Sequence, residues 1–372
     1  MGGTPSEGMP VRCPAITDPE RGLADARDFD AILTRLSSPA PVAGAEEFDR
    51  GLIRADGRVD LCKQGVGPVQ VARVVQTAVA SPHATHLLLG TNALGTPGAR
   101  ELAGALTPGH RISTVYLGCN RIDADGAAAL ADRLADDDGI RALWLKRNPI
   151  GDAGVAHLAA ALASNTTLRT LDLVNTGLTV TGLAALADAL AARPPVMQRL
   201  FLGGNALRAD AVPTLVRLVR DGGVRELYLA VNQLGDDGAA VLADGVAGYG
   251  MTLGLGGNGI TDMAPLAAAL GSWTGLDLSR PPSERALGGR SNEVGDAGAA
   301  LLAEALPGSA LRRLDVRFTG VTGRGARLLL AAAGRLDHLG INGGVPRRMR
   351  RSAPRSGTPP HADISAIASV YR

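Results

Sequence analysis

The stretch LWLKRNPIGDAGVAHLAAAL, from Leu143 to Leu162, decides the fold because its pattern recurs along the chain. The template L-x-L-x-x-N-x-L begins at Leu87, Val115, Leu143, Leu171, Leu200, Leu227 and Leu253, in copies 26 to 29 residues apart. Degraded copies begin at Val59, Leu276 and Leu314, and a last, partial copy begins at Leu339 with no helix expected after it. About ten copies therefore cover residues 57–345, and a fixed period of this length indicates a solenoid of stacked units.

Each copy predicts a short strand, a turn and a helix. In GDAGVAHLAAAL, Leu158 and Leu162 have helical spacing, and the aspartate before them can cap the helix. We expect the strands to pair in parallel and the helices to cover the outer face. An asparagine amide can satisfy backbone groups where the chain leaves each strand. The predicted structural ladder is Asn92, Asn120, Asn148, Asn205, Asn232, Asn258 and Asn292, with Thr176 and Thr319 in the same slot of two copies.

These motifs resemble the leucine-rich repeat over about four fifths of the chain. The period of 28 to 29 residues and the GDAG-type helices look like its ribonuclease-inhibitor subclass. The resemblance implies an α/β horseshoe with a parallel inner sheet and outer helices. It also implies a general binding scaffold. The resemblance is therefore specific for the fold but does not identify the binding partner. Because Ran GTPase-activating proteins use the same subclass, a regulator of a small GTPase is the alternative, although no residue motif carries that activity here.

The repeat sets the expected boundaries. Residues 1–43 are predicted to be an N-terminal extension with a capping helix, because a solenoid needs its first layer covered. Residues 44–345 form the solenoid, with an insertion at 280–291 that reads as a tolerated loop or a binding loop. Residues 346–372 form a basic, Pro-rich tail. This tail is either a solvated segment or a contact for an acidic partner. In the second case, its apolar residues would form a segment that docks in cis or in trans: Ile364, Ile367, Val370 and Tyr371.

Composition narrows the class of protein. The 372 residues carry a net charge of +2, which gives no general case for nucleic acid or membrane binding. The three cysteines form no CxxC pair, which favours reduced thiols, and no uncharged apolar run approaches the length of a membrane span. Arginine and alanine dominate and only two lysines occur, so we expect a bacterial, cytoplasmic protein.

Trp144 lies between two template leucines, and side chains alternate across a strand. If the leucines face the core, Trp144 faces the inner, concave side of the sheet. The same column holds four of the ten aromatic residues, and the next column is mostly glycine or alanine, which leaves gaps for a partner's side chains. Alternatively, the rings pack on one another and shade the sheet. The predicted partner site is Tyr116, Trp144, Lys146, Arg147, Asp172, Arg199, Phe201 and Tyr228.

Motifs for catalysis are weak. The six histidines are scattered, without HExxH or Cys/His metal spacing. The stretch GLGGNG at Gly254 matches a dinucleotide fingerprint, but it is a repeat copy in register. We therefore predict no enzyme activity, no metal and no cofactor. The predicted function is a scaffold that binds an unidentified protein or peptide on its concave, aromatic-lined face.

Overall fold

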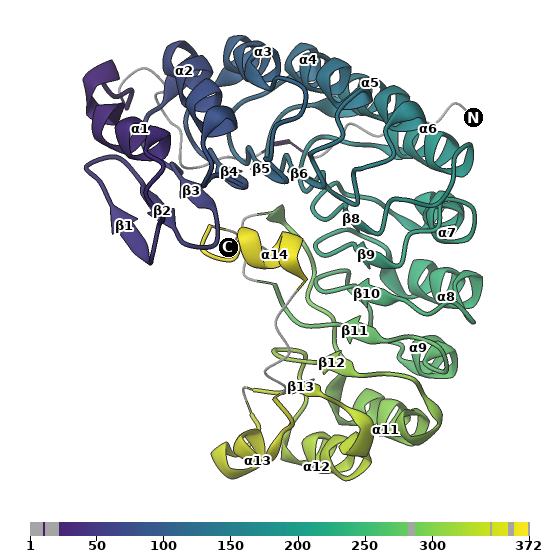
Figure 1. The fold of residues 1–372 in the computed structure, drawn as a ribbon. Helices are drawn as coiled ribbons and strands as arrows, with labels where there is room; N and C mark the ends of the chain where they lie inside the picture. The colour runs from purple at the N-terminus through teal and green to yellow at the C-terminus, as the bar shows by residue number, and fades with distance from the viewer. Residues whose placement is uncertain (1–9, 12–21, 282–286, 343, 356–360, 371–372) are drawn as a thin grey trace. The chain divides into compact units, whose positions relative to one another are not determined.

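The computed structural model describes residues 10–11, 22–281, 287–342, 344–355 and 361–370. The chain divides into two compact units, which are described separately. Unit 1 comprises Met1–Met197 and Pro359–Arg372, and unit 2 comprises Gln198–Thr358. In both units, short strands alternate with helices along the chain, as the repeat predicts (Figure 1).

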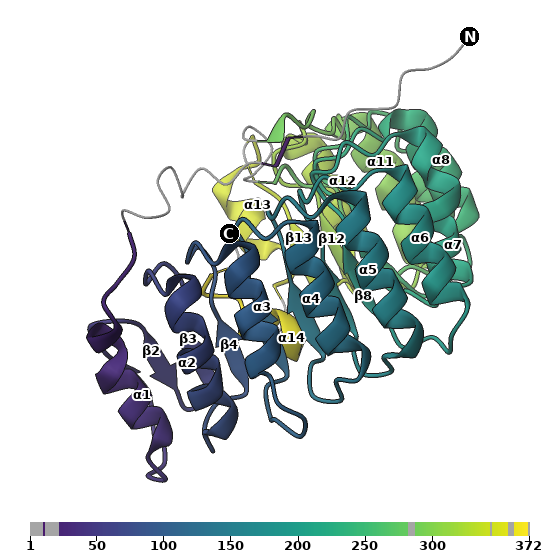
Figure 2. The ribbon, with the colours of Figure 1, turned by 90° about the horizontal axis from the view of Figure 1, so that it is seen from above.

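Unit 1 begins with the turn η1 (Ala26–Phe29) and helix α1 (Asp30–Ser37). Its strands are β1 (Ala45–Glu47), β2 (Leu52–Arg54), β3 (Arg58–Asp60), β4 (His86–Leu88), β5 (Thr114–Tyr116), β6 (Ala142–Trp144) and β7 (Thr170–Asp172). Its repeat helices are α2 (Gly67–Ala80), α3 (Gly95–Ala105), α4 (Ala124–Ala135), α5 (Gly151–Ser164) and α6 (Val180–Ala191), and the unit also holds α14 (Ala362–Ala366). Figure 2 shows the repeat helices side by side, each packed on the next.

The first strands of unit 1 differ from the rest. β1 pairs with β2, and β2 with β3, in antiparallel fashion, whereas β3 to β7 are parallel. Gly51 (φ 85°) and Gly57 (φ 84°) stand at the two turns, where a positive φ suits glycine. The sequence pattern did not predict this hairpin, because residues 45–54 carry no repeat template.

Unit 2 contains only parallel strand pairs among its described strands. They are β8 (Arg199–Phe201), β9 (Glu226–Tyr228), β10 (Thr252–Gly254), β11 (Gly275–Asp277), β12 (Arg313–Asp315) and β13 (His338–Gly340). Its helical segments are η2 (Ala209–Ala211), α7 (Val212–Arg220), α8 (Gly235–Gly245), α9 (Ala264–Ala269), α11 (Gly295–Ala305), η3 (Leu306–Gly308), α12 (Gly323–Ala332), η4 (Ala333–Arg335) and α13 (Arg347–Ser352).

The core lies between strands and helices in each unit. The template leucines are buried, among them Leu143 at 3% and Leu145 at 0% exposure, and so are the apolar faces of the helices. The predicted α/β leucine-rich-repeat solenoid is therefore confirmed. The partial copy at Leu339 differs from its prediction, because the short helix α13 follows it and packs on α12.

The asparagine slot joins neighbouring repeats. Asn148 Nδ2 donates to the carbonyls of Leu117 (3.0 Å) and Leu145 (2.8 Å), and its Oδ1 accepts from the amides of Asn120 (2.9 Å) and Ile122 (3.1 Å). Asn92, Asn120, Asn205, Asn232, Asn258 and Asn292 make all or part of the same pattern, and all seven are buried. The side chains of Asn92, Asn120, Asn148, Asn232, Asn258 and Asn292 thus satisfy backbone groups of two consecutive repeats, and Asn205 Nδ2 donates to carbonyls of its own repeat.

The residue before this slot has a left-handed backbone. Its φ lies between 50° and 71° at Lys63, Thr91, Cys119, Arg147, Asn175, Gly204, Val231, Gly257 and Phe318. Such values are uncommon outside glycine. The solenoid turn therefore imposes one backbone conformation on many residue types. Arg147 takes this conformation in the turn that follows β6.

A second link joins consecutive helix starts. Asp152 accepts hydrogen bonds from the amide (2.7 Å) and hydroxyl (2.5 Å) of Thr179 in the next repeat. Asp296 does the same with Thr322, at 2.9 and 2.6 Å. The sequence predicts that such aspartates cap their own helices, but the carboxylates of Asp152 and Asp296 bond to the next repeat.

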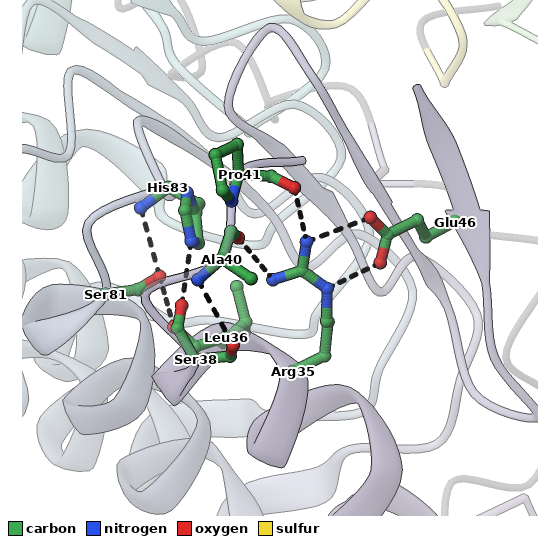
Figure 3. Close-up of polar contacts among 8 residues, drawn as sticks. All are labelled: Arg35, Leu36, Ser38, Ala40, Pro41, Glu46, Ser81 and His83. Atoms are coloured by element: carbon green, nitrogen blue, oxygen red, sulfur yellow. Dashed lines mark hydrogen bonds and ion pairs between the residues drawn. The ribbon is translucent and has the colours of Figure 1, made fainter. Parts of the chain in front are cut away.

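The N-terminal layer of unit 1 is held by polar contacts (Figure 3). Arg35 on α1 donates to both carboxylate oxygens of Glu46 on β1, at 2.7 and 2.9 Å, and to the carbonyls of Ala40 and Pro41. His83 Nε2 lies 2.8 Å from the carbonyl oxygen of Ser38. These bonds attach α1 and its following loop to the first strands and to the turn after α2.

Among the helices in the described residues, none is long and apolar enough to cross a membrane.

Candidate binding surface

The third residue of each strand forms a column on the inner face, the face of the sheet away from the helices. In unit 1 the column is Asp60, Leu88, Tyr116, Trp144 and Asp172, paired in register across β3 to β7. In unit 2 it is Phe201, Tyr228, Gly254, Asp277, Asp315 and Gly340.

Burial corrects one expectation for unit 1. Trp144 has 0% of its surface exposed, Tyr116 5% and Lys146 7%, and Asp172 is also buried. Only Arg147 of the unit 1 site residues is partly exposed. The prediction of solvent-exposed rings is wrong here, because strand alternation fixes the face of a side chain and not what covers that face.

The glycine column takes the chain's own side chains. A methyl group at Gly90 would lie 2.4 Å from Cε1 of Tyr116, and one at Gly118 would lie 2.8 Å from the Tyr116 hydroxyl and 3.1 Å from Cγ of Lys146. The glycines therefore leave room for Tyr116 and Lys146, where we expected room for a partner's side chains.

The electrostatics of this face follow from its burial. Burial raises the pKa of the Tyr116 hydroxyl, and nearby acidic groups add to the effect. Burial lowers the pKa of Lys146, while Asp172 opposes that shift. Asp172 Oδ1 accepts a hydrogen bond of 2.8 Å from the Val174 amide, which fixes the carboxylate at the end of β7.

The C-terminal segment, residues 361–370, lies on the inner face of unit 1 (Figure 1). The Thr170 hydroxyl on β7 donates to Asp363 Oδ2 at 2.7 Å, and both residues are buried. On β3, Arg58 donates to the carbonyl of Ser365 (3.5 Å), and the Ser369 hydroxyl donates to Asp60 Oδ2 (3.4 Å). The segment thus bridges β7 and β3 of its own chain, whereas the sequence alone leaves docking in cis or in trans open.

A cavity of about 380 Å³ borders this segment. Its lining includes Glu47, Asp60, Cys62, Tyr116, Ser369 and Val370. Burial raises the pKa of the Cys62 thiol, and the charge of Asp60 raises it further, so the thiol is protonated at neutral pH. Cys13 lies outside the described residues.

The inner face of unit 2 is more open. The rings of Phe201 and Tyr228 stack, with centroids 4.3 Å apart and planes inclined by 9°. Glu226 accepts from the Tyr228 hydroxyl (2.9 Å) and pairs with Arg199 (2.8 Å). Phe201 and Arg199 are buried, at 8% and 5% exposure, whereas Tyr228 and Glu226 are half-buried.

An acidic pair follows in the same column of unit 2. Burial raises the pKa of Asp277, and Asp315 on the adjacent strand raises it further. Asp315 is itself paired with Arg317 at 2.7 Å. Both aspartates can be found in the column from the sequence, but neither belongs to the predicted partner site. Within the described residues, no group of three or more His, Cys, Asp or Glu side chains has the arrangement of a metal site.

A family model described as Leucine Rich repeat matches residues 164–187 and 224–243. No curated protein sequence matches the chain. Among solved structures, the chain is similar to actin-binding site 2 of leiomodin-1, with 19% identity, 41% of this chain and 88% of that chain covered, and a TM-score of 0.34. It is also similar to a chain of the Rad7 and Elc1 complex in yeast, with 14% identity, 75% of each chain covered and a TM-score of 0.43. Together with the repeat template and the alternation of strands and helices, the family match identifies leucine-rich repeats in this chain.

Proposed function

We propose that the chain is a non-catalytic scaffold that binds a protein or peptide segment on the inner face of its sheet. The observation that carries this proposal is the segment 361–370, which lies on the inner face of unit 1 as a peptide ligand would. This face holds a helical segment through side-chain hydrogen bonds and a buried apolar residue. It therefore has the chemistry to hold a similar segment of a partner protein.

The eight predicted site residues take different parts in this proposal. Arg147 and Tyr228 are accessible enough to touch a partner directly. The others are buried and would form the floor of the inner face within their own unit: Tyr116, Trp144, Lys146 and Asp172 in unit 1, and Arg199 and Phe201 in unit 2. An accessible aromatic residue beside a charged pair is typical of an interface anchor with a polar rim.

Further parts of the proposal rest on the sequence. We place the repeats in the ribonuclease-inhibitor-like subclass by their period, and the protein in a bacterial cytoplasm by its composition. The exposed arginines of α13, Arg347, Arg348 and Arg351, are proposed to meet an acidic partner. Regulation of a small GTPase is the alternative function.

The test is affinity capture from native cytosol, followed by titration of the captured partner. Tyr228→Ala should weaken binding at least tenfold, as loss of an aromatic anchor does. Arg147→Ala should act mainly on the association rate and its salt dependence. Val241→Ala and His157→Ala, exposed on helices α8 and α5, are the matched controls and should bind as the wild type does.

Unchanged affinity in both inner-face variants would refute the proposed surface. Stimulated GTP hydrolysis by candidate small GTPases, measured with the same variants, would instead favour the alternative.

A further inference from the structure

The segment that lies on unit 1 has a definite chemical pattern. Its sequence is HADISAIASV, and α14 covers Ala362–Ala366. Ala366 and Ile367 are buried, at 5% and 0% exposure, while Ala368 and Ser369 are exposed. Asp363 and Ile367 are four residues apart, so a helical turn brings the carboxylate and the apolar side chain to the same face. The segment is an amphipathic turn that presents one acid and one aliphatic group.

The inner face offers groups that match this pattern. Thr170 is fully buried and donates its hydroxyl to the Asp363 carboxylate. His86 on β4 lies near enough for the charge of Asp363 to raise its pKa, although burial lowers that pKa overall. Arg58 on β3, whose guanidinium is paired with Asp56, donates to the carbonyl of Ser365 in the segment. An acid in the first turn is therefore recognised by the buried Thr170 hydroxyl, with the His86 imidazole near enough to be affected by its charge.

Such a short helix is not stable by itself. Helices below about 12 residues are marginal in water, so α14 depends on the face that it covers. A described segment of ten residues, 361–370, makes a small interface compared with those of stable complexes. Because the segment is covalently part of the chain, its binding is intramolecular, and this raises its effective concentration to about millimolar order.

We propose that the inner face of β3 to β7 is a docking site for a short amphipathic helix with an acidic residue in its first turn and an aliphatic residue four positions later. Residues 361–370 are its resident ligand, and a protein partner with such a helix binds by displacing them. This inference rests on the proposed function and specifies the partner's chemistry and its regulation by the chain's own tail.

The experiment uses the full chain and a fluorescein-labelled peptide of residues 361–370, followed by fluorescence polarisation. In the wild type the resident segment competes with the peptide. Ile367→Asp in the chain removes the buried aliphatic group and releases the segment, so the labelled wild-type peptide should bind at least tenfold more tightly than it does to the wild type. Ala368→Asp introduces the same charge at an exposed neighbour and should leave peptide binding at the wild-type level.

The peptide and the face are then varied to test recognition. Peptides that carry Asp363→Ala or Ile367→Asp should bind the Ile367→Asp chain at least tenfold more weakly. Thr170→Val, added to that chain, should have a similar effect. Asp363→Ala in the full chain is a second way to release the segment and should also open the site. Circular dichroism of each variant checks that the repeats remain folded.

Three results would overturn the inference. The first is a folded Ile367→Asp chain that does not bind the peptide at millimolar concentration. The second is a peptide affinity that does not change when Asp363, Ile367 or Thr170 is substituted. The third is a wild type that forms dimers with increasing concentration while both tail variants stay monomeric, because the occupant would then be the tail of a second copy. If the peptide fails but partner capture still depends on Arg147 or Tyr228, only this inference falls and the proposed function stands.

Discussion

The inner faces of the two units are built from the same column of strand residues but differ in what lies on them. In unit 1, Tyr116 and Trp144 are buried, and residues 361–370 bridge β3 and β7. In unit 2, Tyr228 is half-buried against Phe201, and an acidic pair follows it. The same repeat position is therefore fully buried at Trp144 in unit 1 and half-buried at Tyr228 in unit 2, although Phe201 in the same column of unit 2 is buried too.

The sharpest test of this difference is the loss of one ring from each unit. Trp144→Ala should lower the free energy of unfolding by about 3–5 kcal/mol, as removal of a buried aromatic residue does. Tyr228→Ala should cost about 1 kcal/mol, mainly the stacking with Phe201. Urea denaturation followed by circular dichroism measures both. Equal costs would remove the distinction between the two faces.

The asparagine slot should show no such difference between units. Asn148→Ala in unit 1 and Asn232→Ala in unit 2 each remove four side-chain hydrogen bonds to backbone groups. Each should cost on the order of 1–3 kcal/mol, because buried backbone groups lose their partners. Thr176→Asn is the control, and we expect the asparagine to be tolerated there. A large cost in one unit only would contradict a shared structural role.

Acid should weaken unit 1 through Asp137. Its carboxylate lies 2.8 Å from His110 Nε2, and both side chains are 1% exposed. Burial alone would raise the pKa of Asp137, but hydrogen bonds from His110, Ile140 and Gly139 lower it overall. Because the folded-state pKa is depressed, this stabilisation is present above the ordinary Asp pKa and is lost as the pH falls through the folded value.

Asp137→Asn should therefore cost about 2 kcal/mol at pH 7, where a charge-assisted hydrogen bond is lost. The difference from the wild type should shrink in acid, as thermal unfolding between pH 7 and pH 3 would show. Asp138→Asn changes an exposed neighbour and should have little effect at either pH. A constant cost across this range would contradict a charged Asp137 carboxylate in this hydrogen bond.

Unit 2 should show the opposite and smallest effect, at Asp277. Burial and the neighbouring Asp315 raise the pKa of this carboxyl, so its charged form destabilises the fold at neutral pH. The stability that it contributes is present below the ordinary Asp pKa and is lost as the pH rises through the folded value. Asp277→Asn should stabilise unit 2 by about 0.5 kcal/mol at pH 7, as relief of like charges on adjacent strands does.

In acid this gain should disappear, and thermal unfolding at pH 7 and pH 3 measures it. Asp221→Asn, exposed after α7, is the control. Destabilisation by Asp277→Asn at pH 7 would mean that the hydrogen bond from the Ser279 amide outweighs the repulsion from Asp315.

The repeat template predicts most of the fold because strand, turn and helix each leave a periodic signal. It places Leu143 and Leu145 in the core and Trp144 on the opposite face of the strand. It does not predict the burial of Trp144, because alternation fixes the face on which a side chain lies and not what covers that face. It also gives no signal for the hydrogen bond between Thr170 and Asp363, which are 193 residues apart. The repeat template also does not predict the antiparallel hairpin of β1 and β2, because residues 45–54 contain no template residue. Its formation depends on the glycine turn between the two strands.

The aspartate-to-threonine bonds between helix starts have a consequence for how such a chain can grow. Asp152 bonds to Thr179, and Asp296 bonds to Thr322, so each bond crosses from one repeat to the next. The two partners stand in unlike repeats: Asp152 and Asp296 follow a glycine, whereas Thr179 and Thr322 are followed by Val180 and Gly323. A gene duplication that copies only the repeat with the acid therefore leaves one aspartate facing a glycine, whereas a duplication that copies both repeats restores a complete bond in each copy. Lengthening of the array by recombination is thus favoured in steps of two repeats at these positions.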